Sequence, residues 1–284
     1  MKVLVTGGRG FIGSYVCLQL ESDGHNVVSF DLPKNDIRNK DSLFGAVSKV
    51  DGVIHLAGVL GTQECINNPY PCIETNIVGS INLLEALDHH KVPASFIGVG
   101  NYWMNNTYSI TRNTSDRFAS MYVRDRGVKV NVVRAVNAYG PGQVPAEPYG
   151  KAKVRKVLPS FICRALANHP IEIYGDGEQF SDMIYVGDVA KAMLSSLMKA
   201  SSGDVFDQVI DIGPVHHTSV KSIAQRVKAV IGSESEIVHL PMRPGERPED
   251  VIANPLAMGL IDMDPDDLLP FSEGLEKTIA YYRA

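Results

Sequence analysis

The chain has 284 residues, of which 44% are hydrophobic and 21% are charged, and its formal net charge is −5. These values exclude an intrinsically disordered chain, and the lack of basic runs disfavours a dedicated nucleic-acid-binding protein. No apolar stretch approaches the roughly 20 residues that span a bilayer. The four cysteines form no CxxC pair, so we expect neither a zinc site nor a disulfide framework. The N-terminus lacks the flank of a signal peptide, so we expect a cytoplasmic protein with no metal and no membrane partner.

Short apolar runs alternate with helical patterns through the first half of the chain. This alternation predicts right-handed βαβ crossovers and a Rossmann-type, doubly wound parallel sheet with helices on both faces. The expected strands are apolar without alternation, as in a sheet that is buried on both faces. We expect strands at 3–6, 26–31, 52–56, 95–99 and 128–134, and helices at 11–22, 40–47, 73–89 and 108–126.

The texture of the sequence changes after Gly140. A stretch with Pro, Gly and basic residues leads into a helix expected at 158–167. We expect the segments 184–186, 189–199 and 209–212 to return to the first sheet as strand, helix and strand. The sequence therefore predicts two lobes with interleaved chain segments, the smaller one being a C-terminal α/β substrate lobe.

The first expected strand–helix turn carries a glycine pattern. Residues Thr6–Gly13 read T-G-G-R-G-F-I-G, which satisfies both G-x-G-x-x-G and G-x-x-G-x-x-G. Glycines there allow a tight turn, close approach of the backbone to a pyrophosphate and close packing of helix on strand. The helix N-terminus adds free amides and partial positive charge. The pattern predicts a dinucleotide site that includes Gly7, Gly10, Phe11, Ile12 and Gly13.

Asp31 ends the second expected strand, 18 residues after Gly13. A carboxylate at this place can bond both ribose hydroxyls of adenosine and repels a 2′-phosphate, so we expect NAD and not NADP. Asp36 and Ile37 are candidates to flank the adenine. The alternative interpretation is a glycine-rich turn with an unrelated acidic residue.

Motifs along most of the chain resemble those of the extended short-chain dehydrogenase/reductases that act on nucleotide sugars, the NAD-dependent epimerase/dehydratase family. The resemblance implies tightly bound NAD, which oxidises a sugar carbon and usually returns the hydride within one turnover. It implies an NAD-binding domain of residues 1–140 and about 182–213, and a nucleotide-sugar-binding lobe of about 141–181 and 214–284. The segments that carry the likeness are 6–13, 53–58, 76–80, 108–116, 134–142, 173–179, 184–189 and 243–246.

The third expected strand ends in Leu56, Ala57 and Gly58, at the sheet edge where the cofactor should lie. His55 is interpreted as a packing residue there, since a lone histidine is more often part of a core. The resemblance implies that Asn76, on the following helix, braces this end of the sheet.

The family's catalytic pattern is Tyr-x-x-x-Lys, and the matching segment here runs from Tyr108 to Arg112. A spacing of four places Tyr108, Arg112 and Asp116 on one helical face. A phenol, with a usual pKa of about 10, needs a nearby cation to act as a base near neutrality. Arg112 can supply that charge, although its guanidinium is larger than an ammonium and never donates its proton. The alternative is a surface helix with an ordinary Tyr–Arg contact.

The segment before this tyrosine departs from the family's pattern. Asn101 stands where a Ser or Thr is usual, and only six residues separate it from Tyr108. An amide can bond a substrate oxygen but cannot shuttle a proton as a hydroxyl does. The Asp-Glu pair of the dehydratases is absent between Ser95 and Tyr108, which favours epimerisation. Glu64 and Cys65 are candidates for a second proton-transfer group.

The segment 243–246, R-P-G-E, resembles the family's diphosphate-binding motif. Arg243 would grip phosphate and Glu246 would bind a ribose hydroxyl, and Asn137 resembles a position that bonds substrate phosphate or ribose. The alternative is a solvated turn. The family's second arginine is replaced by Ser181, and the candidates to restore its charge are Lys153, Arg155 and Lys156.

The leading hypothesis is therefore an NAD-dependent epimerase of nucleoside-diphosphate sugars, most simply at C4, that forms a homodimer by analogy with the family. One alternative is a non-standard dehydratase or decarboxylase. The other is a catalytically silent protein that binds NAD or a sugar nucleotide, which the departures at Asn101, Arg112 and Ser181 motivate.

Overall fold

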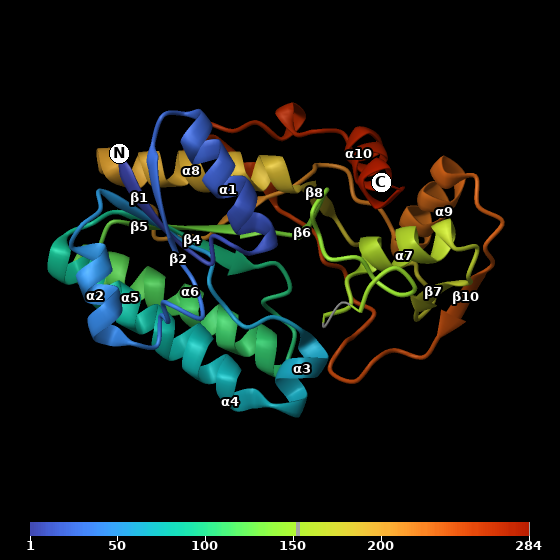
Figure 1. Ribbon diagram of the computed structural model, residues 1–284, viewed down its shortest axis with the longest axis horizontal. Coiled ribbons are helices and arrows are strands. Elements are labelled where there is room, and N and C mark those ends of the chain that lie inside the picture. The colour runs from blue at the N-terminus through green and yellow to red at the C-terminus, as the bar shows by residue number, and fades with distance from the viewer. Residues whose placement is uncertain (152–153, 284) are drawn as a thin grey trace.

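A six-stranded parallel sheet forms the centre of the larger part of the molecule (Figure 1). The computed structural model describes residues 1–151 and 154–283. The strand order β2-β1-β3-β4-β5-β9 is that of a doubly wound sheet that starts at β1 and extends both ways. The strands are β1 (Lys2–Thr6), β2 (Asn26–Phe30), β3 (Gly52–His55), β4 (Ala94–Val99), β5 (Val130–Ala135) and β9 (Ile210–Ile212).

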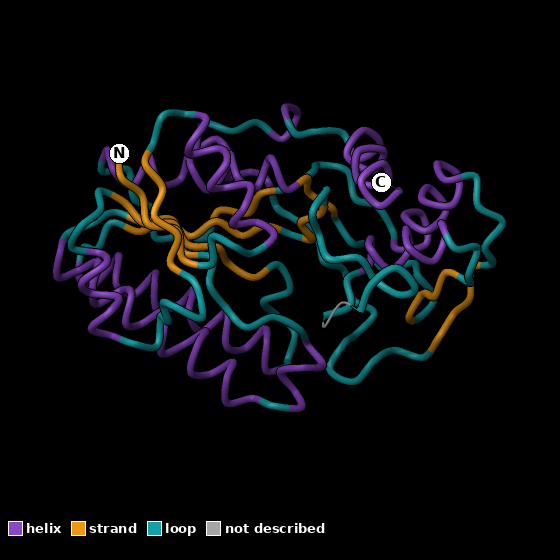
Figure 2. The backbone as a smooth tube through the Cα atoms, viewed as in Figure 1, coloured by secondary structure: helices purple, strands orange, loops and turns teal. Residues whose placement is uncertain are grey.

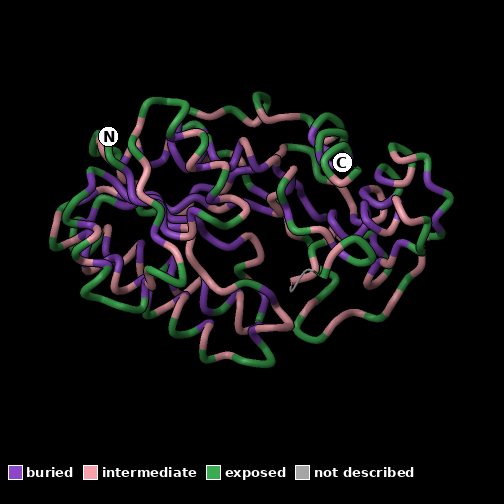
Figure 3. The backbone as a smooth tube through the Cα atoms, viewed as in Figure 1, coloured by how far each residue is buried: buried purple, intermediate pink, exposed green. Residues whose placement is uncertain are grey.

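Helices cover both faces of this sheet, which confirms the predicted fold class (Figures 1 and 2). Successive residues of each strand point to opposite faces, so Val5 packs under α1 and α8 whereas Leu4 packs under α2, α5 and α6. The sheet strands are largely buried and the outer helix faces exposed (Figure 3). The helices are α1 (Phe11–Ser22) and α8 (Val186–Ser202) on one face, and α2 (Lys40–Val47), α5 (Ser80–His90) and α6 (Thr107–Arg126) on the other.

The segment between β3 and α5 holds two short helices that the sequence analysis did not predict. They are α3 (Thr62–Asn67) and α4 (Pro69–Cys72), each too short to give a clear helical period. The predicted helix at 73–89 is a π-helical segment, η1 (Ile73–Gly79), that continues into α5.

The second part of the molecule has its own core, built around side chains such as Leu158 and Ile223. Two strands pair in parallel there, and three helices pack around them. These elements are β7 (Ile171–Tyr174), β10 (Ile237–Leu240), α7 (Val157–Leu166), α9 (Val220–Ile231) and α10 (Phe271–Arg283). The 3-10 segment η2 (Pro255–Ile261) instead packs in the core of the large sheet through Met258 and Ile261, and η3 (Pro265–Asp267) follows it along the chain.

One predicted strand pairing is wrong. The strand β8 (Met183–Tyr185) pairs with β6 (Asn137–Tyr139) in a separate two-stranded sheet, so the segment 184–186 does not return to the large sheet. The chain leaves β5 and enters β6 after one residue, and β6 offers β8 an edge away from the main sheet. The segment 209–212 does return there, because β9 pairs with β5. Within the described residues, no helix is both long and apolar enough to cross a membrane.

Ile54 tests the core of the large sheet because its side chain is fully buried in a central strand. We expect Ile54→Ala to lower the free energy of unfolding by about 2–5 kcal/mol, through lost apolar burial and the cavity left behind. Leu256→Ala, at a side chain that is 90% exposed, is the control and should change it by less than about 0.5 kcal/mol. Urea unfolding measures both, and equal effects would contradict this description of the core.

Candidate active site

The turn between β1 and α1 requires glycine at Gly7 and Gly13. Gly7 has a φ of +75°, and its amide donates to the Phe30 carbonyl at 3.2 Å. A Cβ on Gly13 would stand 2.0 Å from the Gly7 carbonyl oxygen, so helix and turn are in direct backbone contact. The N-cap residue Gly10 has no side chain to satisfy the first amides of α1. The turn thus presents the amides of Phe11, Ile12 and Gly13 as donors for an anion such as a pyrophosphate.

Asp31 lies beside this turn at the end of β2. Its carboxylate accepts from the backbone amide of Arg9 at 3.3 Å and from the Ser29 hydroxyl. Both contacts hold the carboxylate next to the glycine turn, where the ribose of a dinucleotide would lie. The residues present therefore fit the adenosine half of NAD.

The two residues predicted near the adenine face other groups. Asp36 accepts three bonds from the side chain of Arg38, the shortest at 2.6 Å, and one from its backbone amide, and this hydrogen bonding lowers the pKa of Asp36. Arg38 also reaches Glu74 at 3.2 Å. Ile37 is 4% exposed and packs in the core. The structure thus gives Asp36 and Ile37 local partners on the edge of the site.

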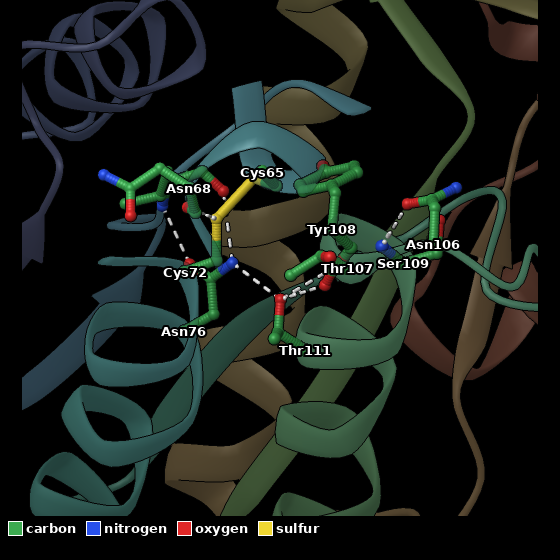
Figure 4. Close-up of a disulfide and its surroundings, with 10 residues drawn as sticks. Cys65, Asn68, Cys72, Asn76, Asn106, Thr107, Tyr108, Ser109 and Thr111 are labelled. Carbon is green, nitrogen blue, oxygen red and sulfur yellow. Dashed lines mark hydrogen bonds between the residues drawn. A yellow bond between two sulfur atoms is a disulfide. The ribbon is translucent and has the colours of Figure 1, made fainter. Parts of the chain in front are cut away.

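Asn76 is fully buried, and its side-chain amide both donates and accepts hydrogen bonds. Its Nδ2 donates to the Val59 carbonyl and to the Thr111 hydroxyl, each at 3.1 Å, and its Oδ1 accepts from the Val59 amide at 2.8 Å. It therefore joins η1 to the segment after β3, which contains Leu56, Ala57 and Gly58, and to α6 (Figure 4). His55 is also buried, between the hydroxyls of Thr6 and Ser80.

Tyr108 and Arg112 lie on successive turns of α6. Arg112 is 4% exposed. Its guanidinium donates to the Ala57 carbonyl at 3.3 Å and to the Ile97 carbonyl, so it connects the ends of β3 and β4. Tyr108 is partly buried. Burial raises the pKa of Tyr108 above its usual range, while the Arg112 charge acts in the opposite direction. Arg112 thus places a fixed positive charge close to the phenol.

Asp116 lies one turn further along the same face of α6. It is 3% exposed and accepts a long hydrogen bond from the Val99 amide at 3.4 Å. Burial raises the pKa of Asp116 to about 6, against the charges of Arg112 and Arg134 and the amide of Val99, which lower it. The three groups predicted to share a helical face therefore meet the carboxyl edge of the sheet together.

Asn101 lies in the short loop 100–106 between β4 and α6. Its Nδ2 contacts the Met104 sulfur at 3.3 Å, and its carbonyl accepts from the Met104 amide at 3.1 Å. The loop ends at Asn106, whose side chain caps α6 by accepting from the Ser109 amide at 3.0 Å. This cap fixes where α6 begins, and Tyr108 follows it within the first turn.

The expectation of no disulfide is wrong for one pair of cysteines. Cys65 in α3 and Cys72 in α4 are bonded, with their Cα atoms 6.1 Å apart, and both are fully buried. The sequence hid this pair because two short helices bring the residues together across a bend. Figure 4 shows the disulfide and Tyr108 at the same end of α6. As a disulfide, Cys65 has no thiol proton to transfer, so it is not a proton-transfer group in this state.

The segment 243–246 reaches across from the second part of the molecule to α3 and α6. Gln63 donates to the Pro244 carbonyl at 2.6 Å, and Asn106 donates to the Gly245 carbonyl at 3.2 Å. Gly245 has a φ of +73°, and a Cβ there would meet Ile66 at 2.5 Å. The motif predicted to bind diphosphate therefore docks beside the first turn of α6.

Within that motif, Arg243 forms a bidentate ion pair with Glu246, at 2.6 and 2.9 Å. The Arg243 guanidinium also lies 4.9 Å from the ring centre of Tyr174. Arg155 contacts the same tyrosine, donating to its hydroxyl at 2.8 Å, and pairs with Glu172. Tyr174 lies in the segment 173–179 that carries the family likeness, but the sequence gives it no role of its own, because its partners Arg155 and Arg243 are distant in the chain.

Lys156 lies near Glu64 and Arg243, in the region where the two parts of the chain face each other. Although its side chain is exposed, the surrounding protein atoms lower its pKa, the Arg243 charge lowers it further and the Glu64 charge opposes them. Of the three candidates to replace the charge lost at Ser181, Lys153 lies outside the described residues. Asn137 donates to the Ser181 hydroxyl at 3.0 Å.

The model of the NAD dependent epimerase/dehydratase family matches residues 3–213. A putative UDP-glucose 4-epimerase of Methanocaldococcus jannaschii is 29% identical over 277 residues, covering 86% of this chain and 87% of that protein. A UDP-N-acetyl-alpha-D-glucosaminuronate decarboxylase of Bacillus cytotoxicus is 26% identical, covering 99% of this chain and 98% of that protein.

Two solved structures extend the likeness over the whole chain. The UDP-glucose 4-epimerase of Thermotoga maritima, with UDP-glucose, is 28% identical with a TM-score of 0.86, covering 100% of this chain and 99% of that one. The UDP-glucose 4-epimerase of Thermus thermophilus, in complex with NAD, is 26% identical with a TM-score of 0.82 at the same coverage.

The glycine turn gives a direct test of the cofactor site. We expect Gly13→Ala to weaken NAD binding by about tenfold or more, because the added Cβ would push against the Gly7 carbonyl and displace the turn that would hold the pyrophosphate. Overpacking of this kind costs about 1–3 kcal/mol of free energy, and about 1.4 kcal/mol of binding free energy is a tenfold change in affinity. The control is Gly45→Ala in α2, where an added Cβ meets nothing within 4 Å, and it should leave NAD affinity unchanged. Calorimetric titration with NAD measures both, and wild-type affinity in a folded Gly13→Ala protein would contradict the assignment.

Asp116 gives a pH-dependent test of the buried charges. Its folded-state pKa of about 6 lies above its usual 3.8, so the folded chain holds this proton more tightly than the unfolded chain does. Ionisation of Asp116 therefore destabilises the fold as the pH rises from about 4 to 6, and Asn cannot ionise. The free energy of unfolding of Asp116→Asn minus that of the wild type should rise by about 3 kcal/mol between pH 3.5 and pH 7. Urea unfolding across this range measures the difference in the free energy of unfolding. If that difference stays constant or falls as the pH rises, the pKa of Asp116 is not raised in the folded chain.

Proposed function

Because the chain belongs to the NAD-dependent epimerase/dehydratase family, we propose that it is an NAD-dependent nucleotide-sugar epimerase, most simply acting at C4. The observation that carries this proposal is the placement of Tyr108 beside the buried Arg112 charge, whose guanidinium bonds the Ala57 carbonyl at the carboxyl edge of the sheet. Gly7 of the glycine turn lies against the same residue, since a Cβ there would stand 2.8 Å from the Ala57 amide nitrogen. A phenol in that position can take a proton from a sugar hydroxyl and return it.

NAD, when bound, would accept a hydride from the sugar carbon and return it to either face of the resulting keto sugar. Gly7, Gly10 and Gly13 would hold its pyrophosphate, and Asp31 its adenosine ribose. With hydride transfer supplied by NAD, the protein would orient the sugar and would accept and return one proton of a sugar hydroxyl.

Tyr108 would manage that proton. The Arg112 charge favours the phenolate, the form of Tyr108 that can accept the proton of the sugar hydroxyl, and burial favours the neutral phenol, which would hold that proton until the sugar oxygen takes it back. Asn101 would donate a hydrogen bond to a sugar oxygen, and Arg243 would bind the diphosphate. The Arg243–Glu246 pair means that a diphosphate must compete with a carboxylate already in place.

Two other functions remain to be separated from this one. A decarboxylase is favoured by the Bacillus cytotoxicus relative, and it would share the oxidation step. A dehydratase of the usual kind is disfavoured, because no acidic residue lies between Ser95 and Tyr108. A silent NAD or sugar-nucleotide binder is motivated by Asn101, Arg112 and Ser181.

We extend the proposal to a cytoplasmic homodimer that docks through η1, α5 and α6. The support is three exposed apolar side chains, Ile73 and Val78 on η1 and Ile110 on α6. Apolar side chains gathered on a surface are typical of interfaces.

The function is tested by incubating the purified protein with UDP-, dTDP- and GDP-sugars and following sugar stereochemistry by NMR and bound NADH by absorbance. We expect interconversion of C4 epimers. Tyr108→Phe should lower kcat by about 100-fold or more, since it removes the acid–base group, and should leave NAD affinity nearly unchanged. Tyr70→Phe, at a side chain that is 73% exposed, is the control.

The other outcomes each select a different function. Release of carbon dioxide or of water would identify a decarboxylase or a dehydratase. Tight NAD binding with no hydride transfer from any sugar would identify a silent binder. An unchanged rate in Tyr108→Phe would remove this tyrosine from the site.

A further inference from the structure

A row of three residues crosses the carboxyl ends of β4, β5 and β9. Gly98 is in register with Arg134, and Arg134 is in register with Asp211. Phe96 and Val132, two residues earlier in their strands, pack in the core under α5 and α6. Because side chains alternate along a strand, Arg134 also faces α6. This row and α6 therefore bring charged side chains from β5, β9 and α6 close together.

Gly98 leaves the space that Asp116 occupies. A Cβ at this position would stand 3.0 Å from Oδ2 of Asp116, which is tighter than ordinary contact. A glycine inside a strand weakens it and often marks close approach of another group. Here that group is a buried carboxylate, close enough to Arg112 and Arg134 for both charges to act on it. Asp116 therefore interacts electrostatically with both Arg112 and Arg134.

Arg134 is held from the other side by Asp211, at 3.0 Å, and its side chain is 12% exposed. This pairing leaves the flat face of the guanidinium available. Tyr102 covers that face, with its ring centre 3.9 Å from the Arg134 Cζ. The ring is 43% exposed, so burial in the core does not account for its position. A guanidinium stacked on an aromatic face contributes about 0.5–2 kcal/mol.

Tyr102 belongs to the loop 100–106, directly after Asn101 and directly before Trp103. The loop is anchored at its two ends: Gly100 packs against the Ala135 carbonyl of β5, and Asn106 caps α6 and donates to the Gly245 carbonyl. Between them, the Met104 amide bonds back to Asn101, and the Tyr102–Arg134 stack is a side-chain contact from the loop to the sheet.

We propose that Arg134 is a positioning residue of the active site, and that its stack on Tyr102 holds the loop that presents Asn101 to the substrate. The proposal rests on the proposed function, in which Asn101 bonds a sugar oxygen. Arg134 itself would touch neither substrate nor cofactor. It would act through Tyr102 on the loop and through Asp116 on Arg112.

The experiment uses Trp103, the only tryptophan of the chain, as a reporter of the loop. Tyr102→Leu removes the ring from an exposed side chain and so should fold. Tyr102→Phe keeps the ring and serves as the rescue variant. Arg134→Lys keeps the positive charge between Asp116 and Asp211 but loses the flat face. Acrylamide quenching of Trp103 fluorescence is measured for each, together with kcat and KM for the nucleotide sugar that the wild type converts.

We expect Tyr102→Leu to raise the Trp103 quenching constant about twofold and to lower kcat about tenfold, since loss of the stack frees the loop. KM should change little, because the nucleotide would be bound elsewhere. Tyr102→Phe should match the wild type, and Arg134→Lys should raise quenching.

Wild-type quenching and kcat in Tyr102→Leu would overturn the proposal, as would equal effects of Tyr102→Leu and Tyr102→Phe. Unchanged quenching in Arg134→Lys would remove Arg134 from the role. If the wild type transfers no hydride, the proposed function fails, and the Trp103 measurement still decides whether the stack positions the loop.

Discussion

The two hydrogen bonds from the Arg112 guanidinium to the carbonyls of Ala57 and Ile97 hold the centre of this site together. They join α6 to the ends of β3 and β4, and thereby fix the position of the first turn of α6, which carries Tyr108, relative to the sheet. A guanidinium carries donors on several nitrogens in one plane, so it can reach two strands at once, whereas an ammonium offers a single nitrogen. The positive charge of Arg112 is therefore held in one place, whereas the flexible side chain of a lysine would leave it mobile.

A fixed buried charge needs a balancing partner. The Asp116 carboxylate lies close enough to Arg112 for the two charges to attract each other, and Gly98 leaves the room for Asp116. The arginine, the aspartate and the missing side chain in β4 therefore form one unit, and a change at any of them is felt at Tyr108.

The parts of this site that the sequence predicted are those with local causes. The glycine turn and Asp31 are defined within one strand–turn–helix unit, and the Tyr108–Arg112–Asp116 face follows from helical spacing alone. The Tyr102–Arg134 stack depends on the register of β4 against β5, which no local pattern carries. The Cys65–Cys72 bond depends on a bend between two very short helices, and the partner of β8 depends on where β6 turns away. The sequence pattern predicted a strand at 184–186, but it did not indicate that β6 is the strand it pairs with.

The departures at Asn101 and Arg112 bear on whether this site is active or silent. A protein that only held NAD would need the glycine turn, Asp31 and the Asn76 brace, all of which lie away from Arg134. It would gain nothing from a carboxylate buried at a net cost, which the raised pKa of Asp116 records. It would also gain nothing from a substrate-side loop docked on the cap of α6 through Asn106 and Gly245. These groups converge on the first turns of α6, where Tyr108 lies. This convergence supports the proposed acid–base role of Tyr108 over a protein that only binds NAD.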